Sequence, residues 1–257
     1  MSKIELRHQC CMEYMRGLPD NAFDIVVTSP PYNQLNQSGG GFIKASGYGE
    51  KLKGGYKSHS DDMPEAEYQA WMRSMLAECM RICKGIVWIN HKIRFRDGVG
   101  IHPLHFFTAP FYSEVIWDRG GSITLNARKY APSHEVIYGF GKPHFWDRLH
   151  DMSMSVWRIP PTSQGIDHPC PFPIALVQKL IESSCPPNGT VFDPFAGSGT
   201  TGIACINSGR SFVGCELDEG YTNAARKRLA AHQAQPRMFD APKEKVEQQA
   251  RMFDTEV

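Results

Sequence analysis

The sequence has no strong excess of either charge, since 28 lysines and arginines are balanced by 27 aspartates and glutamates, for a net charge of +1. That balance excludes a histone-like or tail-driven nucleic-acid binder, although a local basic groove would still neutralise phosphates. Long apolar runs are also missing, and none approaches the roughly 20 residues that cross a bilayer. The polar residues 1–9 lack the apolar core of a secretory signal. We therefore expect a cytoplasmic protein without a membrane partner.

Spacings typical of metal ligands are missing as well. The chain has 8 cysteines, but no two are arranged as Cys-x-x-Cys, and Cys79 and Cys83 are merely one helical turn apart. His102 and His105 have neither a nearby cysteine nor a His-Glu-x-x-His context. We therefore expect no metal site, and we expect the cysteines to be reduced thiols.

What the sequence does contain is an alternation of strand-like and helix-like segments. Its 257 residues suffice for one or two domains, and 41% hydrophobic residues can form a substantial core. Strands are expected at 23–28, 85–90, 114–117, 135–140, 190–193 and 211–216. Helices are expected at 64–84, about 174–183, from the glycines near 199 to about 208, and about 221–233. This alternation predicts an α/β fold with a doubly wound, mostly parallel, Rossmann-like sheet.

A single domain is expected over residues 1–232. Within it, residues 34–60 are rich in Gly, Ser and Lys and predict a long, flexible loop with a function of its own. Residues 143–167 mix aromatic, basic and proline residues in no periodic order. The polar remainder, 233–257, is expected to form a loosely held C-terminal tail.

A glycine-rich turn follows the expected strand 190–193. Gly197, Gly199 and Gly202 fit the pattern Gly-x-Gly-x-x-Gly, and Glu216 ends the next strand about 20 residues further on. Such glycines let the backbone approach a dinucleotide-type ligand, and a carboxylate at that distance binds ribose hydroxyls. No lysine follows the glycines, which argues against a P-loop. The pattern predicts a nucleotide-type cofactor, and glycines that serve tight packing alone are the simpler alternative.

A second motif, Ser29-Pro30-Pro31-Tyr32, ends the expected strand 23–28. The two prolines restrict the backbone, so the Ser29 hydroxyl and the Pro30 carbonyl can point in one direction. Together they could accept hydrogen bonds from both hydrogens of an NH2 group, while the Tyr32 ring offers a flat face to a planar base. Ser-Pro-Pro also occurs in many turns, so the motif gains its meaning from its combination with the glycine motif.

Together the two motifs resemble those of the S-adenosylmethionine-dependent DNA amino-methyltransferases, in the circularly permuted group whose catalytic motif precedes the cofactor motif. The resemblance extends over nearly the whole chain, to about Leu229. It covers the catalytic motif 23–33, a later strand 135–142, the lead-in 168–173 to the cofactor half, the cofactor loop 193–201 and the ribose-binding segment 214–221.

The resemblance implies which residues act in catalysis and which bind the cofactor. Catalysis would depend on Ser29, Pro30, Pro31 and Tyr32. The cofactor would be bound by Asp193, Phe195, Ala196, Gly197, Ser198, Gly199, Thr200, Glu216, Leu217, Pro173 and Cys10, with Ile174 at the border of the site. Gln9-Cys10 is a departure, because the family commonly has Gly-Asp there, and that aspartate contacts the adenine of the cofactor.

The implied reaction is methyl transfer to an exocyclic amine of a base in double-stranded DNA. Such an amine is a poor nucleophile because its lone pair is delocalised into the ring. Holding both of its N–H bonds would favour a more pyramidal nitrogen, aimed at the methyl group. This positioning needs no covalent cysteine and no metal. The base must be flipped out of the duplex to be reached.

Two target bases remain open. In the family a leading serine in this motif mostly accompanies cytosine N4, whereas Asp or Asn mostly accompanies adenine N6. However, Ser-Pro-Pro-Tyr-Asn, the glycine-rich loop after it and residues 88–94 resemble a phage and orphan subset that is often taken as adenine-specific. On balance we expect adenine N6, with cytosine N4 as the alternative.

Several basic and polar residues are expected to contact DNA. Segments 34–60 and 143–167 would read the base sequence, the second as a small target-recognition insertion. Contacts are predicted from Asn33, Lys92, Arg94, Arg96, Arg119, Arg128, Lys129 and Arg148. For any one of the basic residues, a solvated charge without a ligand is an equally good interpretation. The resemblance also suggests a homo-oligomer, a dimer or larger.

The tail contains a repeat, since Gln235-Pro-Arg-Met-Phe239 recurs as Gln249-Ala-Arg-Met-Phe253. Both copies resemble the short Gln-x-x-Met-Phe peptide that docks on bacterial sliding clamps. Clamp binding is one interpretation of the repeat. Packing of the tail on the catalytic domain or on a second subunit is the other.

Two further classes of function fit parts of the sequence. A dinucleotide-dependent oxidoreductase would use the three glycines but would leave the motif at Ser29 without a role. A DNA-binding module that has lost catalysis would explain the departure at Cys10. RNA as the substrate is disfavoured only by the resemblance.

Overall fold

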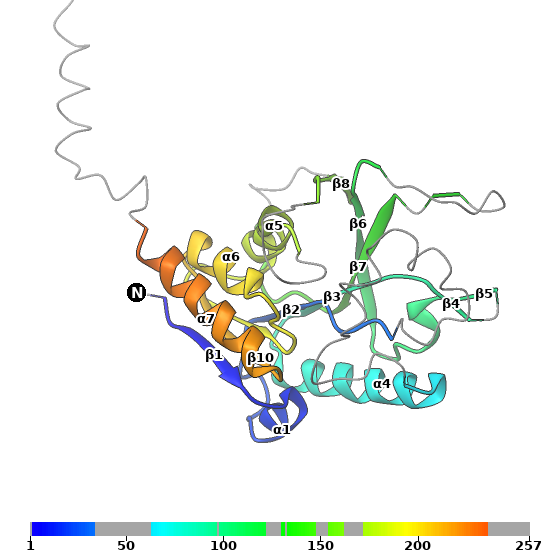
Figure 1. Cartoon of the computed structure of the whole chain (residues 1–257), viewed down its shortest axis with the longest axis horizontal. Helices are drawn as coiled ribbons and strands as arrows, with labels where there is room; N and C mark the ends of the chain where they lie inside the picture. The colour runs from blue at the N-terminus through cyan, green and yellow to red at the C-terminus, as the bar shows by residue number, and fades with distance from the viewer. Residues whose placement is uncertain are drawn as a thin grey trace, which may run out of the picture.

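The computed structural model of the protein describes residues 2–33, 63–96, 98–121, 130, 131, 133–147, 154–161 and 172–235. These residues form a central eight-stranded sheet in the order β1-β10-β9-β2-β3-β7-β6-β8, a two-stranded sheet and flanking helices (Figure 1). The central strands are β1 (Ile4–His8), β2 (Ile25–Thr28), β3 (Ile86–His91), β6 (Phe111–Asp118), β7 (His134–Gly141), β8 (Val156–Arg158), β9 (Thr190–Asp193) and β10 (Ser211–Glu216). The other elements are α1 (Cys11–Arg16), α4 (Glu65–Ile82), α5 (Ile174–Ser184), α6 (Thr200–Ser208), α7 (Glu219–Gln233), a 3-10 turn (Pro103–His105) and the small sheet of β4 (Arg94–Arg96) and β5 (Val99–Ile101).

The central sheet is mostly parallel. Strands β1, β10, β9, β2 and β3 are parallel neighbours, whereas β7 is antiparallel to both β3 and β6. The connections from β2 to β3 and from β9 to β10 contain α4 and α6, because parallel neighbours need a crossover. This arrangement confirms the predicted α/β fold with a doubly wound, Rossmann-like sheet.

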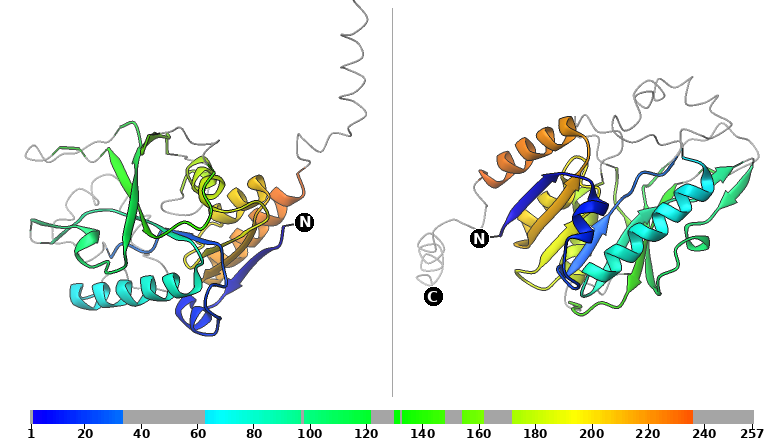
Figure 2. Two further views of the ribbon diagram at one scale, coloured as in Figure 1. Left: turned by 180° about the vertical axis from the view of Figure 1, so that it is seen from behind. Right: turned by 90° about the horizontal axis from the view of Figure 1, so that it is seen from below.

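Helices cover both faces of the sheet (Figure 2). Helices α5, α6 and α7 pack on one face and α1 and α4 on the other, so each face has its own apolar core. Alternate residues of β2 divide between these cores, with Ile25 and Val27 in the first and Val26 in the second. The apolar face of α4 is buried in the second core, at Tyr68, Met72, Met75, Leu76, Cys79 and Ile82.

The sequence does not predict β1, α1 or β8. β1 is an edge strand, paired with β10, and Leu6 is its one buried residue. An edge strand with little buried surface shows almost no apolar alternation, which explains why its sequence is uninformative. The expected strand at 23–28 starts at Ile25, and the last helix begins earlier than expected, at Glu219, after its N-cap Asp218.

Several expected segments lie outside the described residues. They are the loop 34–60, residues 148–153 and 162–167 of the stretch 143–167, and the tail from residue 236. The described part of the stretch 143–167 contributes β8, which is parallel to β6. Among the helices that the structure describes, none has the length and apolar character that a membrane span requires.

Candidate active site

The two sequence motifs lie next to each other at the carboxyl ends of two central, parallel strands. β2 and β9 are parallel neighbours, so the motif that begins at Ser29 and the glycine turn both follow the carboxyl ends of their strands. The Thr28 hydroxyl donates a hydrogen bond of 2.7 Å to Oδ1 of Asp193. Open α/β sheets bind their ligands outside this edge. The two motifs therefore border one candidate site.

Asp193 is the centre of a buried hydrogen-bond cluster. In addition to Thr28, Thr201 donates its hydroxyl to Oδ2 over 2.6 Å, and the Phe195 backbone N–H donates to Oδ1 over 3.0 Å. Burial raises the pKa of Asp193 from 3.8 to about 6, although the three hydrogen bonds oppose this shift. The cluster joins the end of β2, the glycine turn and the start of α6 through one carboxyl group.

The turn between β9 and α6 has backbone angles that favour glycine. The angle φ is +49° at Gly197 and +79° at Gly199, both in the left-handed region. Gly202 has a different role, because a Cβ added there would lie 2.6 Å from Cδ2 of Leu229. The first two glycines thus shape the turn, and the third allows α6 and α7 to pack closely.

Neighbouring elements brace the same turn. Arg228 of α7 donates to the backbone oxygen of Ser198 over 2.9 Å and lies 3.3 Å from the hydroxyl of Thr200. The Ala196 N–H donates to the backbone oxygen of Cys215 in β10 over 2.9 Å. The predicted cofactor residues Ala196, Ser198 and Thr200 therefore lie in a turn whose position is fixed from two sides.

Glu216 ends β10 beside this turn. Its carboxylate accepts hydrogen bonds from the backbone N–H groups of Gly197 and Asp218, each over 2.9 Å. Burial raises the pKa of Glu216. The next residue, Leu217, is 45% exposed. An oriented carboxylate and an exposed apolar side chain thus stand next to each other.

The segment that departs from the family pattern lies beside Glu216. β1 is parallel to β10, and the Gln9 N–H donates to the backbone oxygen of Glu216 over 3.1 Å. Cys10 follows as the partly exposed N-cap of α1. Pro173 lies elsewhere, as the buried N-cap of α5, a helix that packs against α6 and β2. The predicted cofactor residues therefore come from the ends of β1, β9 and β10 and from the start of α5.

The motif predicted to be catalytic follows β2 and begins at Ser29. Pro30 and Pro31 are buried, whereas Ser29 and Tyr32 are partly exposed. The hydroxyls of Ser29 and Tyr32 lie 2.8 Å apart and share a hydrogen bond. Nζ of Lys92 lies over the Tyr32 ring, 5.2 Å from its centre. The motif is thus a compact turn with its two polar side chains joined.

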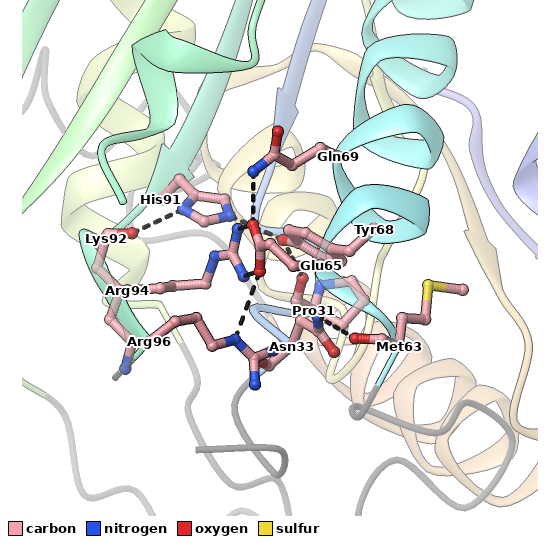
Figure 3. A network of polar contacts seen from close by, with 10 residues as sticks. All are labelled: Pro31, Asn33, Met63, Glu65, Tyr68, Gln69, His91, Lys92, Arg94 and Arg96. Atoms are coloured by element: carbon pink, nitrogen blue, oxygen red, sulfur yellow. Dashed lines mark hydrogen bonds and ion pairs between the residues drawn. The ribbon is translucent and has the colours of Figure 1, made fainter. Parts of the chain in front are cut away.

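Two buried side chains, Tyr68 and His91, support this turn from within the protein (Figure 3). The Tyr68 hydroxyl lies 2.8 Å from the backbone oxygen of Pro31 and 2.8 Å from Nε2 of His91. Nδ1 of His91 lies 2.9 Å from the backbone oxygen of Lys92. Burial lowers the pKa of His91 to about 3, so its ring is neutral at pH 7.

An ion pair between Glu65 and Arg94, at the start of α4, lies next to Tyr68 and His91 (Figure 3). Arg94 donates to both carboxylate oxygens of Glu65, over 2.6 and 2.7 Å, and its guanidinium lies 4.3 Å from the centre of the Tyr68 ring. Burial raises the pKa of Glu65, but hydrogen bonds from Arg94 and Gln69 outweigh it, and the net direction is downward. The fork geometry of the pair fixes β4 against α4.

The residue after the motif, Asn33, is held by the same region. Its side-chain amide donates to the backbone oxygen of Met63 over 2.9 Å, and Arg96 donates to its backbone oxygen over 3.3 Å. Asn33 has φ +54° and is 1% exposed. These contacts join residues 33 and 63 where the chain leaves and re-enters the described structure.

Two predicted DNA contacts, Arg94 and Asn33, are buried in this structure. The Arg94 side chain has no exposed surface, and Asn33 is 1% exposed. Both have internal partners instead. Sequence reasoning takes a basic or polar residue after a strand as exposed, and it cannot see the Glu65 and Met63 partners that bury these two.

The remaining predicted contacts divide into two groups. Lys92 lies beside Tyr32, Arg96 has a 17% exposed side chain, and Arg119 has a 27% exposed side chain that pairs with Glu135. Outside the described residues lie Arg128, Lys129 and Arg148.

Three polar residues of the site, Thr28, Asn90 and Glu135, are missing from the predicted set. Nδ2 of Asn90 donates to the Tyr32 hydroxyl over 2.6 Å and to Oε2 of Glu135 over 2.8 Å. Nη1 of Arg119 donates to the other Glu135 oxygen over 3.0 Å. A polar residue at the carboxyl end of an apolar strand, as at Thr28 and Asn90, is the signal that could have identified two of them.

Metal and thiol chemistry have little structural basis here. Among the described residues, no group of three or more His, Cys, Asp or Glu side chains could hold a metal ion. The thiols that the structure describes are free, and all but that of Cys10 are buried. Burial raises the pKa of Cys11 and of Cys185 to about 12, so these thiols stay protonated and act as packing groups.

Comparison with known proteins gives one consistent family. The type II methyltransferase M.ScaI of Streptomyces caespitosus is 25% identical over 272 residues, which cover 90% of this chain and 82% of that protein. The structure of the cytosine-N4-specific PvuII DNA methyltransferase superposes with a TM-score of 0.69 and 18% identity, covering 96% of this chain and 91% of that one. The M1.HpyAVI–SAM complex gives a TM-score of 0.56 and 22% identity, covering 88% and 100%.

The sequence pattern of the N6/N4 DNA methylase family matches residues 23–227. The matched range contains both motifs, the strands β2, β9 and β10 and the Asp193 cluster. It covers more than half of the 257 residues, and it confirms the resemblance inferred from the two motifs. The chain therefore belongs to the family of N6 and N4 DNA methylases.

Proposed function

We propose that this DNA methyltransferase takes its methyl group from S-adenosylmethionine and transfers it to the exocyclic amine of a base flipped out of double-stranded DNA. The observation that carries the proposal is the Thr28–Asp193 hydrogen bond. It links the ends of the paired strands β2 and β9, and this supports a site where a base at Ser29 and a cofactor at the glycine turn would meet.

The residues at the edge of the sheet suit the chemistry of this cofactor. The Glu216 carboxylate can accept hydrogen bonds from ribose hydroxyls, and Leu217 offers an exposed apolar surface to the adenine ring. The open backbone at Gly197 and Gly199 allows close approach of the methionine part, next to Asp193. When bound, S-adenosylmethionine supplies an electrophilic methyl group on its sulfonium.

The catalytic motif would act by positioning. The Ser29 hydroxyl and the Pro30 carbonyl accept the two hydrogens of the target amine, which turns its lone pair toward the methyl group. The Tyr32 ring stacks on the flipped base. The methyl–sulfur bond would break as the methyl–nitrogen bond forms, so the neutral thioether leaves and the extra proton of the methylated amine passes to solvent. None of these steps requires a covalent intermediate.

For the base we propose N6 of adenine. The resemblance of Ser29 to Asn33, of the loop 34–60 and of residues 88–94 to an adenine-specific subset supports this choice. The second candidate is N4 of cytosine, which the leading Ser29 of the motif favours.

Nucleoside mass spectrometry tests the activity and the base together. Unmethylated double-stranded DNA is incubated with the protein and S-adenosylmethionine, then digested to nucleosides. N6-methyladenine is the expected product. Detection of N4-methylcytosine instead would show that the target base is cytosine. Ser29→Ala should retain cofactor binding and lose most of the product. Absence of product from the wild type on DNA of varied sequence, together with product on RNA, would overturn the DNA assignment.

Thermal stabilisation separates the remaining candidates. Stabilisation by S-adenosylmethionine is expected, because a ligand that binds only the folded state raises its stability. Stabilisation by a nicotinamide dinucleotide instead would favour an oxidoreductase. Binding of DNA without any cofactor effect would favour an inactive binding module, for which Gln9-Cys10 is the sequence indication.

DNA binding is proposed to involve Lys92, Arg96, Arg119, Arg128, Lys129 and Arg148, together with the segments 34–60 and 143–167. We expect the protein to act in the cytoplasm as a homo-oligomer, and light scattering of the purified protein measures its mass. A mass of 28.9 kDa would show a monomer and contradict this expectation.

The tail repeat is proposed to dock on a bacterial sliding clamp. The two Gln-x-x-Met-Phe copies, at 235–239 and 249–253, support this proposal. Calorimetry with a tail peptide and purified clamp is the test, and the control peptide has both Met-Phe pairs replaced by alanines. The absence of heat from the unmodified peptide would end the proposal.

A further inference from the structure

Asn90 lies between the catalytic motif and a carboxyl group that has no role in the chemistry proposed above. It is 1% exposed near the carboxyl end of β3, and Glu135 stands near the start of the neighbouring strand β7. Through its amide nitrogen, Asn90 joins Tyr32 and Glu135, and Arg119 holds the second oxygen of Glu135. A chain of hydrogen bonds therefore runs from Ser29 to Arg119, over the ends of the four neighbouring strands β2, β3, β7 and β6.

The partners of Asn90 determine how its amide is oriented. A carboxylate oxygen only accepts hydrogen bonds, so the amide nitrogen of Asn90 must face Glu135. The same nitrogen is 2.6 Å from the Tyr32 hydroxyl and uses its second hydrogen there. The amide oxygen is then left buried, without a hydrogen-bond partner among the described residues. Such an arrangement is unfavourable for folding alone, and it requires another explanation.

The explanation lies in the proton of the Ser29 hydroxyl. To accept a hydrogen of the target amine, the Ser29 oxygen must direct its own proton elsewhere, and the Tyr32 oxygen is 2.8 Å away. A tyrosine oxygen has two acceptor positions. Asn90 occupies one of them, so the other can face Ser29 when the proton of Tyr32 itself points to a different group.

We propose that Asn90, oriented by Glu135, is a positioning residue that holds the Tyr32 hydroxyl as an acceptor for Ser29 and so directs the Ser29 lone pairs to the target amine. This inference rests on the proposed function, because it assigns base binding to the same motif. It adds a role for the Tyr32 hydroxyl that is separate from stacking by its ring.

A double-mutant cycle tests the proposal through the contact between the Asn90 amide and the Tyr32 hydroxyl. Tyr32→Phe removes the hydroxyl and keeps the ring, and Asn90→Ala removes the donor. Each single variant is expected to lower kcat about 10-fold or more, with the KM for S-adenosylmethionine nearly unchanged. Adding Asn90→Ala to Tyr32→Phe should cause little further loss, because residues that act through one contact are not additive.

Substitutions at Glu135 supply the conservative comparison. Glu135→Gln keeps an oxygen that can accept a hydrogen bond from Asn90, so this variant should retain most of the wild-type kcat. Glu135→Leu has a similar volume without an acceptor and should behave like Asn90→Ala. Asn207→Ala, in α6 and hydrogen-bonded to His232, is the matched control for loss of an asparagine and should leave kcat unchanged. Thermal unfolding identifies any variant that fails to fold.

The outcomes separate this inference from the function on which it rests. If Asn90→Ala causes the same loss in the wild-type protein as in the Tyr32→Phe variant, the positioning role is overturned. A Tyr32→Phe variant with full activity would do the same, provided that Tyr32→Ala is inactive, and the stacking role would then stand. Full activity of both Tyr32→Ala and Ser29→Ala would instead remove the proposed catalytic motif itself.

Discussion

Thr28 and Asp193 are separated by 165 positions in the sequence, yet their side chains form a buried hydrogen bond of 2.7 Å. The donor immediately precedes the motif proposed to be catalytic, and the acceptor begins the motif proposed to bind the cofactor. The bond therefore couples the position of Ser29 to the turn at Gly197. A small displacement of either strand would change the distance between the two reacting groups.

Replacing Thr28 by valine tests this bond with almost no change in shape. The buried Asp193 carboxylate would lose one of its three donors, so the free energy of unfolding should fall by about 2 kcal/mol at pH 7.5. Thr28→Ser keeps the hydroxyl and loses a methyl group, and it should cost about 1 kcal/mol. Urea unfolding of the three proteins measures the difference. A valine variant as stable as the wild type would show that the hydroxyl contributes nothing.

Asp193 should also give the protein a distinct pH dependence. Its pKa of about 6 in the folded protein exceeds the ordinary 3.8, so the folded state binds the proton more tightly than the unfolded state. The resulting stabilisation is complete below about pH 4 and is lost as the pH rises through about 6, with a total of about 3 kcal/mol.

The Asp193→Asn variant isolates this contribution. Glu216 and Glu65 have shifted pKa values too, but both stay in the variant, so their effects cancel in the comparison. Urea unfolding at several pH values from 4 to 7 should show a downward slope for the wild type relative to the variant. Parallel curves would contradict the raised pKa.

Arg94 is expected to act in stability rather than in DNA binding. Arg94→Leu would leave Glu65 without its two closest donors and the Tyr68 ring without its cation, so unfolding should become easier by about 3 kcal/mol. The salt dependence of DNA binding should stay unchanged, because a side chain without exposed surface releases no counterions. Arg73→Leu, on the same helix as Glu65, is the control for loss of one positive charge. A shallower salt dependence in the Arg94 variant alone would restore its predicted phosphate contact.

The central sheet and the meeting of the two motifs follow from local patterns in the sequence. The strand ending at Thr28 and the glycine turn each have a local signature, and the α/β alternation places both at one sheet edge. Apolar spacing in α4 similarly predicts the face that is buried. These features depend on short stretches of sequence, so they can be predicted without knowing which distant residues each segment contacts.

Features that depend on distant partners do not follow from the sequence. Arg94 reads as a surface cation until Glu65 is placed beside it, and Asn90 reads as the end of a strand until Tyr32 and Glu135 are placed around it. The edge strand β1 buries too little surface to show a pattern. The interactions that fix Arg94 and β1 join residues far apart in the chain, and the strand-end position of Asn90 indicates a polar site residue but not its partners.

Lys92 is a predicted DNA contact that lies beside Tyr32 of the proposed catalytic motif. It follows the carboxyl end of β3, and its ammonium lies over the Tyr32 ring, 5.2 Å from the centre. If it binds a phosphate beside the flipped base, Lys92→Ala should reduce the slope of log K against log salt by about 0.9. Lys84 lies before the opposite end of β3 and pairs with Asp24, so Lys84→Ala should leave the slope unchanged. Fluorescence anisotropy with a labelled duplex at several salt concentrations gives both slopes. Equal slopes for the two variants would place Lys92 outside the DNA contact and leave it a role beside Tyr32 alone.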